Sequence, residues 1–266
     1  MILSLTIYMC CGAIVGLMAG LLGLGGGLII VPILIYVFPT LGVKAQYIQQ
    51  LALGTSLASI IFTSLSSAIA HHKMGNVHWD IFKNITPGIL LGTFIGGLIA
   101  SHMPTLFLKI FFICFLFIIT AQMLSNYKPP ANRNIPGKIG TAIVGSIIGL
   151  ISSFVGIGGG TISLTYMYYC NIQMHHAIGT SAAIGFPIAL AGATGYALGG
   201  YNKPDLPEFT IGFVHLQALF GITVTSMLVA PIGAKISNSI PVKKLKRGFA
   251  YFLLIMAIKM IWDIIY

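Results

Sequence analysis

Long runs of apolar residues alternate along the chain with short polar segments. Within these runs, polar and apolar positions do not alternate, so the pattern predicts helices rather than the strands of a β-barrel. A helix needs about 20 apolar residues to cross the hydrocarbon core of a bilayer. We therefore expect an all-α, polytopic membrane protein. About eight full spans are predicted, at residues 3–21, 47–70, 83–101, 105–124, 139–155, 175–198, 209–234 and 246–265.

Two apolar segments, residues 28–38 and 161–170, are too short to span a bilayer. At 1.5 Å per residue each reaches only about 15 to 18 Å, against about 30 Å for the hydrocarbon core. Each is expected to be a half-helix that folds back, or one piece of a broken span. A glycine-rich break precedes each segment, formed by Gly23, Gly25, Gly26 and Gly27 in the first case and by Gly156, Gly158, Gly159 and Gly160 in the second.

Short blocks of sequence recur in the same order along the chain. The stretch "GLMAGLLGLGGGLI" (residues 16–29) recurs as "GLISSFVGIGGGTI" (149–162). Downstream, "ALGTSLASI" (52–60) recurs as "AIGTSAAIG" (177–185). These matches indicate an internal duplication. The predicted units are a first repeat at residues 1–127, a linker at 128–138 and a second repeat at 139–266.

The charge composition supports a membrane location and predicts the orientation. Only 7% of the residues are charged, whereas a soluble domain carries about 25%. The formal net charge is +10, but Lys and Arg in membrane proteins mostly mark cytoplasmic loops, so we expect no nucleic-acid partner. Ten of the 14 Lys and Arg residues fall in segments 71–83, 125–138 and 235–247, which are predicted to be cytoplasmic. This orientation makes the two repeats inverted and turns both termini outward, as in many secondary transporters.

The two glycine breaks are the candidate substrate site. An unwound backbone cannot face lipid, because each unpaired N–H or C=O group costs several kcal/mol there, so it must line a cavity or be buried in protein. The helices that begin near Leu28 and Thr161 would present free N–H groups and a positive dipole end, which bind oxyanions without a cation. Close glycine packing between helices is the alternative role. The matched Gly-Thr-Ser blocks add hydroxyl donors, whose alternative role is interhelical hydrogen bonding: Thr55, Ser56, Thr180 and Ser181.

The ionisable residues argue against an enzyme and against a cation site. The four carboxylates are all predicted at loops or helix ends, so no paired acids are available for hydrolysis. His215 lies within an apolar run and is the histidine best suited to a functional role. The histidines and the four cysteines show no metal-ligand spacing, so we predict no catalytic residue, metal or cofactor. The scarcity of acids favours an anionic substrate. A passive anion channel of the same architecture is one alternative, and an intramembrane enzyme is a weaker one.

The duplicated motifs "GLLGLGGGLIIVPIL" and "SSFVGIGGGTISL", each followed by a Gly-Thr-Ser block, resemble the TauE/SafE family of membrane transporters over about residues 5–265. The resemblance implies an inverted-repeat helical protein in a bacterial or archaeal plasma membrane. It implies transport of sulfite, sulfonates, sulfoacetate or related anions, often as export. It also places both glycine breaks and the Gly-Thr-Ser hydroxyls at a central cavity. The expected partners are a small anion and the lipid bilayer, and a homodimer stays open.

Overall fold

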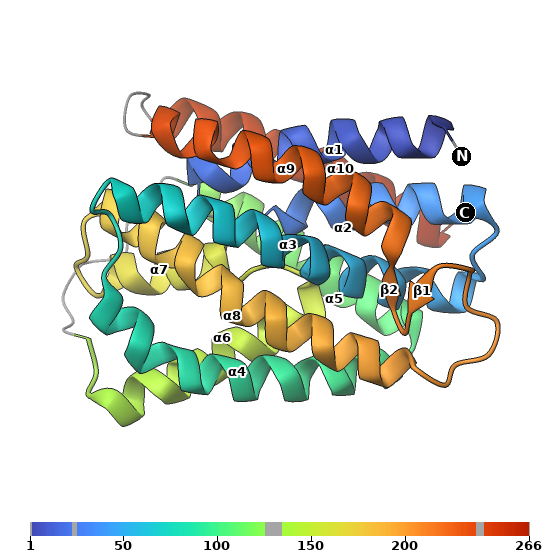
Figure 1. Cartoon of the computed structure of the whole chain (residues 1–266), viewed down its shortest axis with the longest axis horizontal. Helices are drawn as coiled ribbons and strands as arrows, with labels where there is room; N and C mark the ends of the chain where they lie inside the picture. The colour runs from blue at the N-terminus through green and yellow to red at the C-terminus, as the bar shows by residue number, and fades with distance from the viewer. Residues whose placement is uncertain (1, 23–25, 126–134, 238–241, 266) are drawn as a thin grey trace.

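The computed structural model describes residues 2–22, 26–125, 135–237 and 242–265. Ten α-helices lie in these ranges, and most run close to the long axis of the molecule (Figure 1). They are α1 (Ile2–Leu22), α2 (Gly27–Val37), α3 (Ile48–Lys73), α4 (Trp79–His102), α5 (Thr105–Leu124), α6 (Lys138–Val155), α7 (Gly160–Tyr169), α8 (Met174–Gly200), α9 (Leu216–Ser237) and α10 (Val242–Ile265). Two 3₁₀ turns, η1 (Phe38–Leu41) and η2 (Ala45–Tyr47), connect α2 to α3.

Six of the helices that the structure describes are long and apolar enough to cross a membrane, so the chain is a multi-pass membrane protein. They are α3, α4, α5, α6, α8 and α9. The sequence pattern predicts about eight full spans, and these six are found among the described residues. The other two predicted segments are helical as α1 and α10. The two predicted short segments are present as α2 and α7.

The sequence pattern predicts a helix from residue 209, and this prediction is wrong for the segment before α9. The structure has instead a two-stranded antiparallel hairpin, β1 (Thr210–Ile211) with β2 (Val214–His215), and α9 begins only after it. The turn holds Gly212 at φ +52°, where a Cβ atom would overlap the backbone of α8. Packing of the turn against α8 therefore decides the local structure, and a short apolar run cannot reveal such packing.

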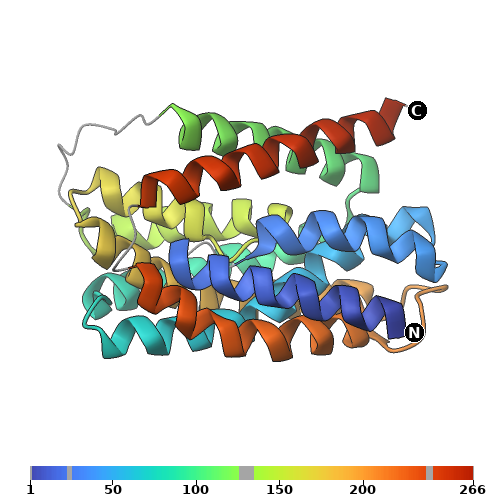
Figure 2. The same ribbon diagram turned by 90° about the horizontal axis from the view of Figure 1, so that it is seen from above.

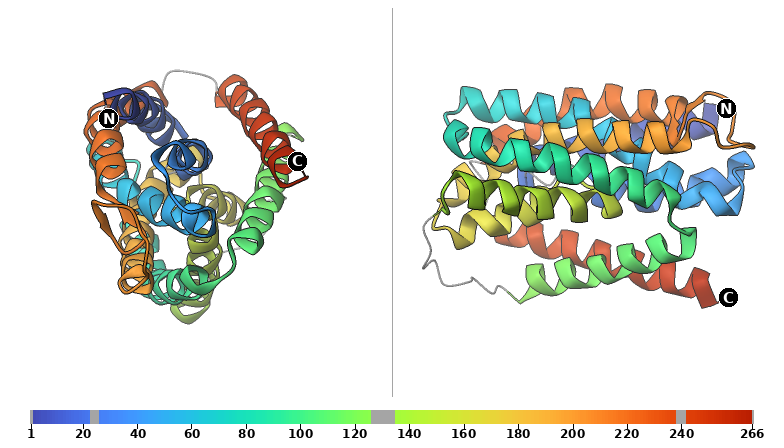
Figure 3. Two further views of the ribbon diagram at one scale, coloured as in Figure 1. Left: turned by 90° about the vertical axis from the view of Figure 1, so that its right-hand side faces the viewer. Right: turned by 90° about the horizontal axis from the view of Figure 1, so that it is seen from below.

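The long helices pack mainly against helices of the other half of the chain. α1 lies along α9, α4 lies along α6, α3 packs against α8, and α5 packs against α10 at one side of the molecule (Figures 2 and 3). Glycines spaced four residues apart make the closest of these contacts, which is the small-xxx-small packing typical of membrane helices. They are Gly12, Gly16 and Gly20 on α1, which face α9, and Gly88, Gly92 and Gly96 on α4, which face α6.

Corresponding helices of the two halves run in opposite directions. α1 begins at the end of the molecule where α10 finishes and runs to the opposite end, whereas its counterpart α6 runs back the other way (Figure 1). The ends of α3, α5 and α9 lie together with the start of α6, at the end away from the start of α1 (Figures 1 and 3). These helix ends adjoin the three basic segments, so the three segments connect helices at the same end. That this end is cytoplasmic stays a prediction.

Candidate substrate site at the glycine breaks

The two glycine breaks lie against one another, although they belong to different halves of the chain. A Cβ atom on Gly27, the first residue of α2, would overlap the carbonyl oxygen of Gly156, which caps the end of α6. Close glycine packing, one of the two roles that the sequence predicts, is therefore present at this contact. Of the other glycines in the first break, Gly26 is described and buried, whereas Gly23 and Gly25 lie outside the described residues.

Glycines in the left-handed conformation produce the breaks. Gly26, at φ +78°, precedes α2, and Gly159, at φ +66°, precedes α7 at the matching position of the second half. Gly156, at φ +69°, ends α6. Residues with a side chain rarely adopt this region, whereas glycine does so at little cost. Gly158 and Gly160 are buried in the same stretch, so the second predicted break is glycine-built throughout.

The start of α7 gathers hydroxyl groups that have no partner within the described residues. Its N-cap is Gly159, which offers no side-chain cap, and the first N–H groups of a helix have no intrahelical partner. Thr161 lies in the first turn of α7, and Ser152 Oγ on α6 lies 3.2 Å from the position of a Cβ atom on Gly159. Both hydroxyls are buried and lack a hydrogen-bond partner in the described part of the chain. Backbone N–H groups and hydroxyls at a positive helix end are suited to an oxyanion.

The threonines of the Gly-Thr-Ser blocks connect the two halves of the chain. Thr55 Oγ1 accepts a hydrogen bond from the backbone N–H of His215, and Thr180 Oγ1 accepts one from the backbone N–H of His78, both at 2.9 Å. His215 directly precedes α9, and His78 directly precedes α4. Because α4 and α9 start at opposite ends of the molecule, the two threonines do not lie next to one another (Figure 1). Their contact with a substrate stays a prediction.

The serines of the same blocks differ from one another. Ser56 Oγ donates a hydrogen bond of 2.7 Å to the carbonyl oxygen of Gly156, so the structure brings this predicted residue directly to the second break. Ser181 Oγ donates to the carbonyl oxygen of Ile178 in its own helix, at 3.0 Å. Both serines are fully buried. Ser56 thus links the first half of the chain to the break in the second half.

Two hydroxyls near the second break, Ser152 and Thr93, are not singled out by sequence reasoning. Thr93 is buried next to Gly149, one turn before Ser152 on α6, and its Oγ1 has no partner among the residues described. For Ser152 a signal is present, because a pair of serines interrupts the apolar run just before the break. Thr93 carries no such signal, since single threonines are common in membrane helices.

His215 has a structural role at the start of α9. Its Nδ1 accepts a hydrogen bond from the backbone N–H of Ala218 at 3.2 Å, and its ring packs against Phe38 and Tyr8. Burial lowers the pKa of the His215 imidazole, so the ring is neutral at pH 7. A neutral ring has the acceptor nitrogen that this contact needs. The side chain therefore caps a helix that starts at the hairpin.

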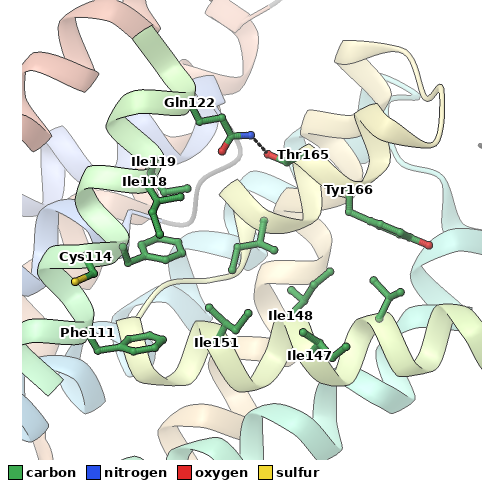
Figure 4. Close-up of a pocket in the computed structure, with 13 residues that line it drawn as sticks. Phe111, Cys114, Ile118, Ile119, Gln122, Ile147, Ile148, Ile151, Thr165 and Tyr166 are labelled. Atoms are coloured by element: carbon green, nitrogen blue, oxygen red, sulfur yellow. Dashed lines mark hydrogen bonds between the residues drawn. The ribbon is translucent and has the colours of Figure 1, made fainter. Parts of the chain in front are cut away.

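A separate cavity of about 660 Å³ lies between α5, α6 and α7 (Figure 4). Isoleucines and phenylalanines dominate its lining, and two of its polar side chains satisfy each other: Gln122 Nε2 donates to Thr165 Oγ1 at 2.7 Å. An anion in this cavity would exchange its water for mainly apolar contacts, which is unfavourable. Ile148 lines the cavity and also lies beside the position of a Cβ atom on Gly159. The cavity is thus a neighbour of the α7 start but not a suitable anion site.

The fold and the site define a class of protein. Multiple apolar spans and two short helices that begin at buried backbone breaks are features of membrane transporters. The family model "Sulfite exporter TauE/SafE" matches residues 8–260. The chain belongs to this family, which implies a membrane transporter rather than an enzyme.

Full-length relatives carry names that agree with this class. A "Probable membrane transporter protein" of Haemophilus influenzae is 37% identical over 250 residues, which cover 94% of this chain and 95% of the relative. The "Probable membrane transporter protein YdhB" of Bacillus subtilis is 28% identical over 240 residues, with 88% of this chain and 90% of the relative covered. A "Probable membrane transporter protein" of Xylella fastidiosa is 28% identical over 267 residues, which cover 97% of this chain and 95% of the relative. No solved structure matches the chain.

Proposed function

We propose that the chain is a secondary transporter that moves small sulfur-containing oxyanions, such as sulfite and sulfonates, across the plasma membrane by alternating access. The name of the family, sulfite exporter, supports the class of substrate. The scarcity of carboxylates, four in 266 residues, supports an anion over a cation.

The start of α7 is the observation that carries this proposal. A left-handed glycine leaves the helix end without a side-chain cap in the described structure, and two buried hydroxyls, Ser152 and Thr161, lack partners among the described residues. Each buried donor without a partner costs about 1–3 kcal/mol. An oxyanion would supply acceptors for both hydroxyls and for the free N–H groups of the first turn.

We infer further that residues 1–127 and 139–266 are inverted repeats joined by the linker 128–138. The opposite directions of α1 and α6 support this, as does the reciprocal packing of α1 on α9 and α6 on α4. In transporters of this type, one part rocks against the other and opens a central site to alternate sides. The contact between Gly27 and Gly156 lies at the boundary between the halves, where such a movement would act.

Binding measurements on the purified protein in detergent test the site. We would titrate sulfite, sulfoacetate, taurine, sulfate and acetate at one pH and ionic strength, with calorimetric or thermal-shift readout. Saturable binding of a sulfur oxyanion is expected, and Thr161→Val or Ser152→Ala should weaken it about tenfold or more. Thr120→Val is the matched control, because Thr120 on α5 is also buried, with a hydroxyl that lacks a partner among the described residues.

Unchanged binding in both Thr161→Val and Ser152→Ala would contradict an anion site at the start of α7. If folded protein binds none of the five anions, sulfur oxyanions are rejected as the substrate class. Counterflow in proteoliposomes then separates the mechanisms: a carrier exchanges labelled for unlabelled sulfite faster than it transports sulfite net, whereas a passive channel shows no such stimulation.

A further inference from the structure

His71, in the last turn of α3, is a buried imidazole with one nitrogen in use. It is 1% exposed, and its Nε2 lies 3.1 Å from the carbonyl oxygen of Gly20 on α1. A carbonyl accepts only, so Nε2 carries the proton and Nδ1 is left as an acceptor. Nδ1 is buried and has no partner among the residues that the structure describes. The structure thus contains a buried basic nitrogen without a hydrogen-bond partner among the described residues.

The second half of the chain makes the same contact with a different side chain. Tyr196 on α8 is fully buried, and its hydroxyl donates a hydrogen bond of 3.0 Å to the carbonyl oxygen of Ser153 on α6. Tyr196 follows His71 at the same sequence offset as Thr180 follows Thr55, and Ser153 is the counterpart of Gly20 in the repeated glycine block. One contact therefore uses a phenol, whose ordinary pKa is near 10, and the other uses an imidazole, whose ordinary pKa is about 6.5.

The polar neighbours of His71 lead inward along one face of α3. Ser67, Thr63 and Ser59 precede it at intervals of four residues, and all three are buried. Ser67 Oγ has no partner among the described residues, whereas Thr63 Oγ1 lies 2.6 Å from Ser226 Oγ on α9. The corresponding positions on α8 are Gly192, Ile188 and Ile184, which are apolar. The hydroxyl row and the imidazole are thus confined to one half of the chain.

The charged and titratable groups around His71 are mostly basic. His175 lies in the first turn of α8, and His72 and Lys73 follow His71 on its own helix. Lys235 lies in the last turn of α9, which packs on α1 beside Gly20, and exposed Asp80 lies in the first turn of α4. A protonated His71 would therefore find no buried carboxylate among the described residues to neutralise it. An oxyanion in the transport path would supply that charge.

We propose that His71 is the proton-binding site of the transport cycle, so that a proton and the anion move together. This inference rests on the proposed function. The step is simple: a proton from water bonds to Nδ1, and the ring becomes an imidazolium with two donors. The N–H at Nδ1 then needs an acceptor, which favours a state in which the contact between α3 and α1 opens towards water or the anion. Release of the anion leaves the cation unpaired, and the proton returns to water.

Histidine NMR on the full chain in detergent tests the proton site without any substrate. The signal of His71 in protein labelled with ¹⁵N-histidine is identified by its absence from the His71→Gln variant, in which the amide keeps a donor for Gly20. We expect a neutral ring at high pH that becomes an imidazolium on acidification, and the titration is followed from about pH 8 down to about pH 5. A ring that stays neutral throughout this range would overturn the proposal.

Transport in proteoliposomes tests the coupling. Labelled sulfoacetate is the probe, because both of its acidic groups are ionised at neutral pH and it carries no proton itself. His71→Gln should retain counterflow at equal pH and lose the accumulation that an imposed pH gradient drives. Tyr196→Phe is the matched control, since it removes the equivalent contact without removing a group whose ordinary pKa lies near neutral pH, and it should retain both activities.

The outcomes separate the two proposals. Gradient-driven accumulation that survives in His71→Gln rejects His71 as the coupling residue, whatever the NMR shows. If neither sulfoacetate nor sulfite is transported by the unmodified protein, the proposed substrate class fails, while the NMR titration still decides whether His71 binds a proton.

Discussion

Thr55 and His215 are joined across the two halves of the protein: the threonine hydroxyl accepts a hydrogen bond of 2.9 Å from the backbone N–H that precedes α9. Thr180 accepts the same bond, of the same length, from the N–H of His78 before α4. Each half thus satisfies an N–H at the start of a helix that belongs to the other half. Such groups have no partner within their own helix, so the hydroxyl stabilises both the helix end and the contact between the halves.

Thr55→Val should lower the free energy of unfolding by about 1–3 kcal/mol, because the buried N–H of His215 loses its acceptor. Thr180→Val should do the same for His78. The two effects should add in the double variant, since the sites lie at opposite ends of the molecule. Thr55→Ser, which keeps the hydroxyl, is the control and should restore most of the loss. Unfolding in detergent measures all four variants, and a valine variant as stable as the parent would contradict the structural role.

Gly27→Ala should prevent correct packing of the two breaks, because the added methyl group would overlap the carbonyl oxygen of Gly156. Backbone on both sides leaves little room for relaxation, so we expect a loss of folded protein rather than a small shift. Gly137→Ala is the control, since a Cβ atom there meets nothing within 4 Å. Size-exclusion chromatography and thermal unfolding of the two variants make the comparison. Equal yields of monodisperse protein would show that the breaks are not in contact.

His215 predicts a specific pH dependence of stability. Its pKa is lowered in the folded protein by burial, whereas in the unfolded chain it is about 6.5. As pH falls below about 6.5, the His215 imidazole binds a proton more readily in the unfolded state than in the folded state. The free energy of unfolding therefore decreases as pH falls from the unfolded pKa towards the lower folded pKa. His215→Asn keeps an acceptor for the N–H of Ala218 and does not titrate. Thermal unfolding between about pH 5 and 8 should show a smaller decline in this variant than in the parent, and identical declines would refute the assignment.

The cavity between α5, α6 and α7 should be dispensable for anion binding. Ile147→Trp fills part of it, and sulfite affinity should be unchanged within about twofold, because the lining offers mainly apolar contacts. Ile143→Trp, at an exposed position on the same helix outside the cavity lining, is the matched control. Calorimetric titration of both variants decides the point. If Ile147→Trp alone weakens sulfite binding tenfold, the anion uses this cavity and the α7 site is wrong.

The elements of the fold are predictable from the sequence wherever a local pattern of apolar residues and glycines marks them. The breaks before α2 and α7 were predictable because four glycines stand in each otherwise apolar run, and the left-handed conformations of Gly26 and Gly159 explain them. The hairpin before α9 was not predictable, because its apolar residues look like the start of a helix. What decides it is the packing of Gly212 against α8, a tertiary contact.

The candidate site was predictable in part for a similar reason. Ser56 is a polar residue within a repeated block, which marks it in the sequence, and its hydroxyl reaches the second break. The donors that occupy Thr55 and Thr180 are backbone N–H groups, which every residue possesses and no sequence pattern marks. Ser152 was within reach of sequence reasoning, since it interrupts an apolar run beside the break, but its approach to Gly159 depends on how α6 and α7 fold back on one another.

The pairing of α1 with α9 has a consequence for biosynthesis. Gly16 packs against Ser226, a residue that the ribosome adds 210 positions later. Until then the glycine face of α1 lacks α9, the helix against which it packs, and the newly inserted early helices must remain in the membrane without this partner. Contacts of such long sequence separation form late and slowly. The contact between α1 and α9 is therefore expected to form only after α9 has left the ribosome, with the early helices accommodated until then by lipid or by the insertion machinery.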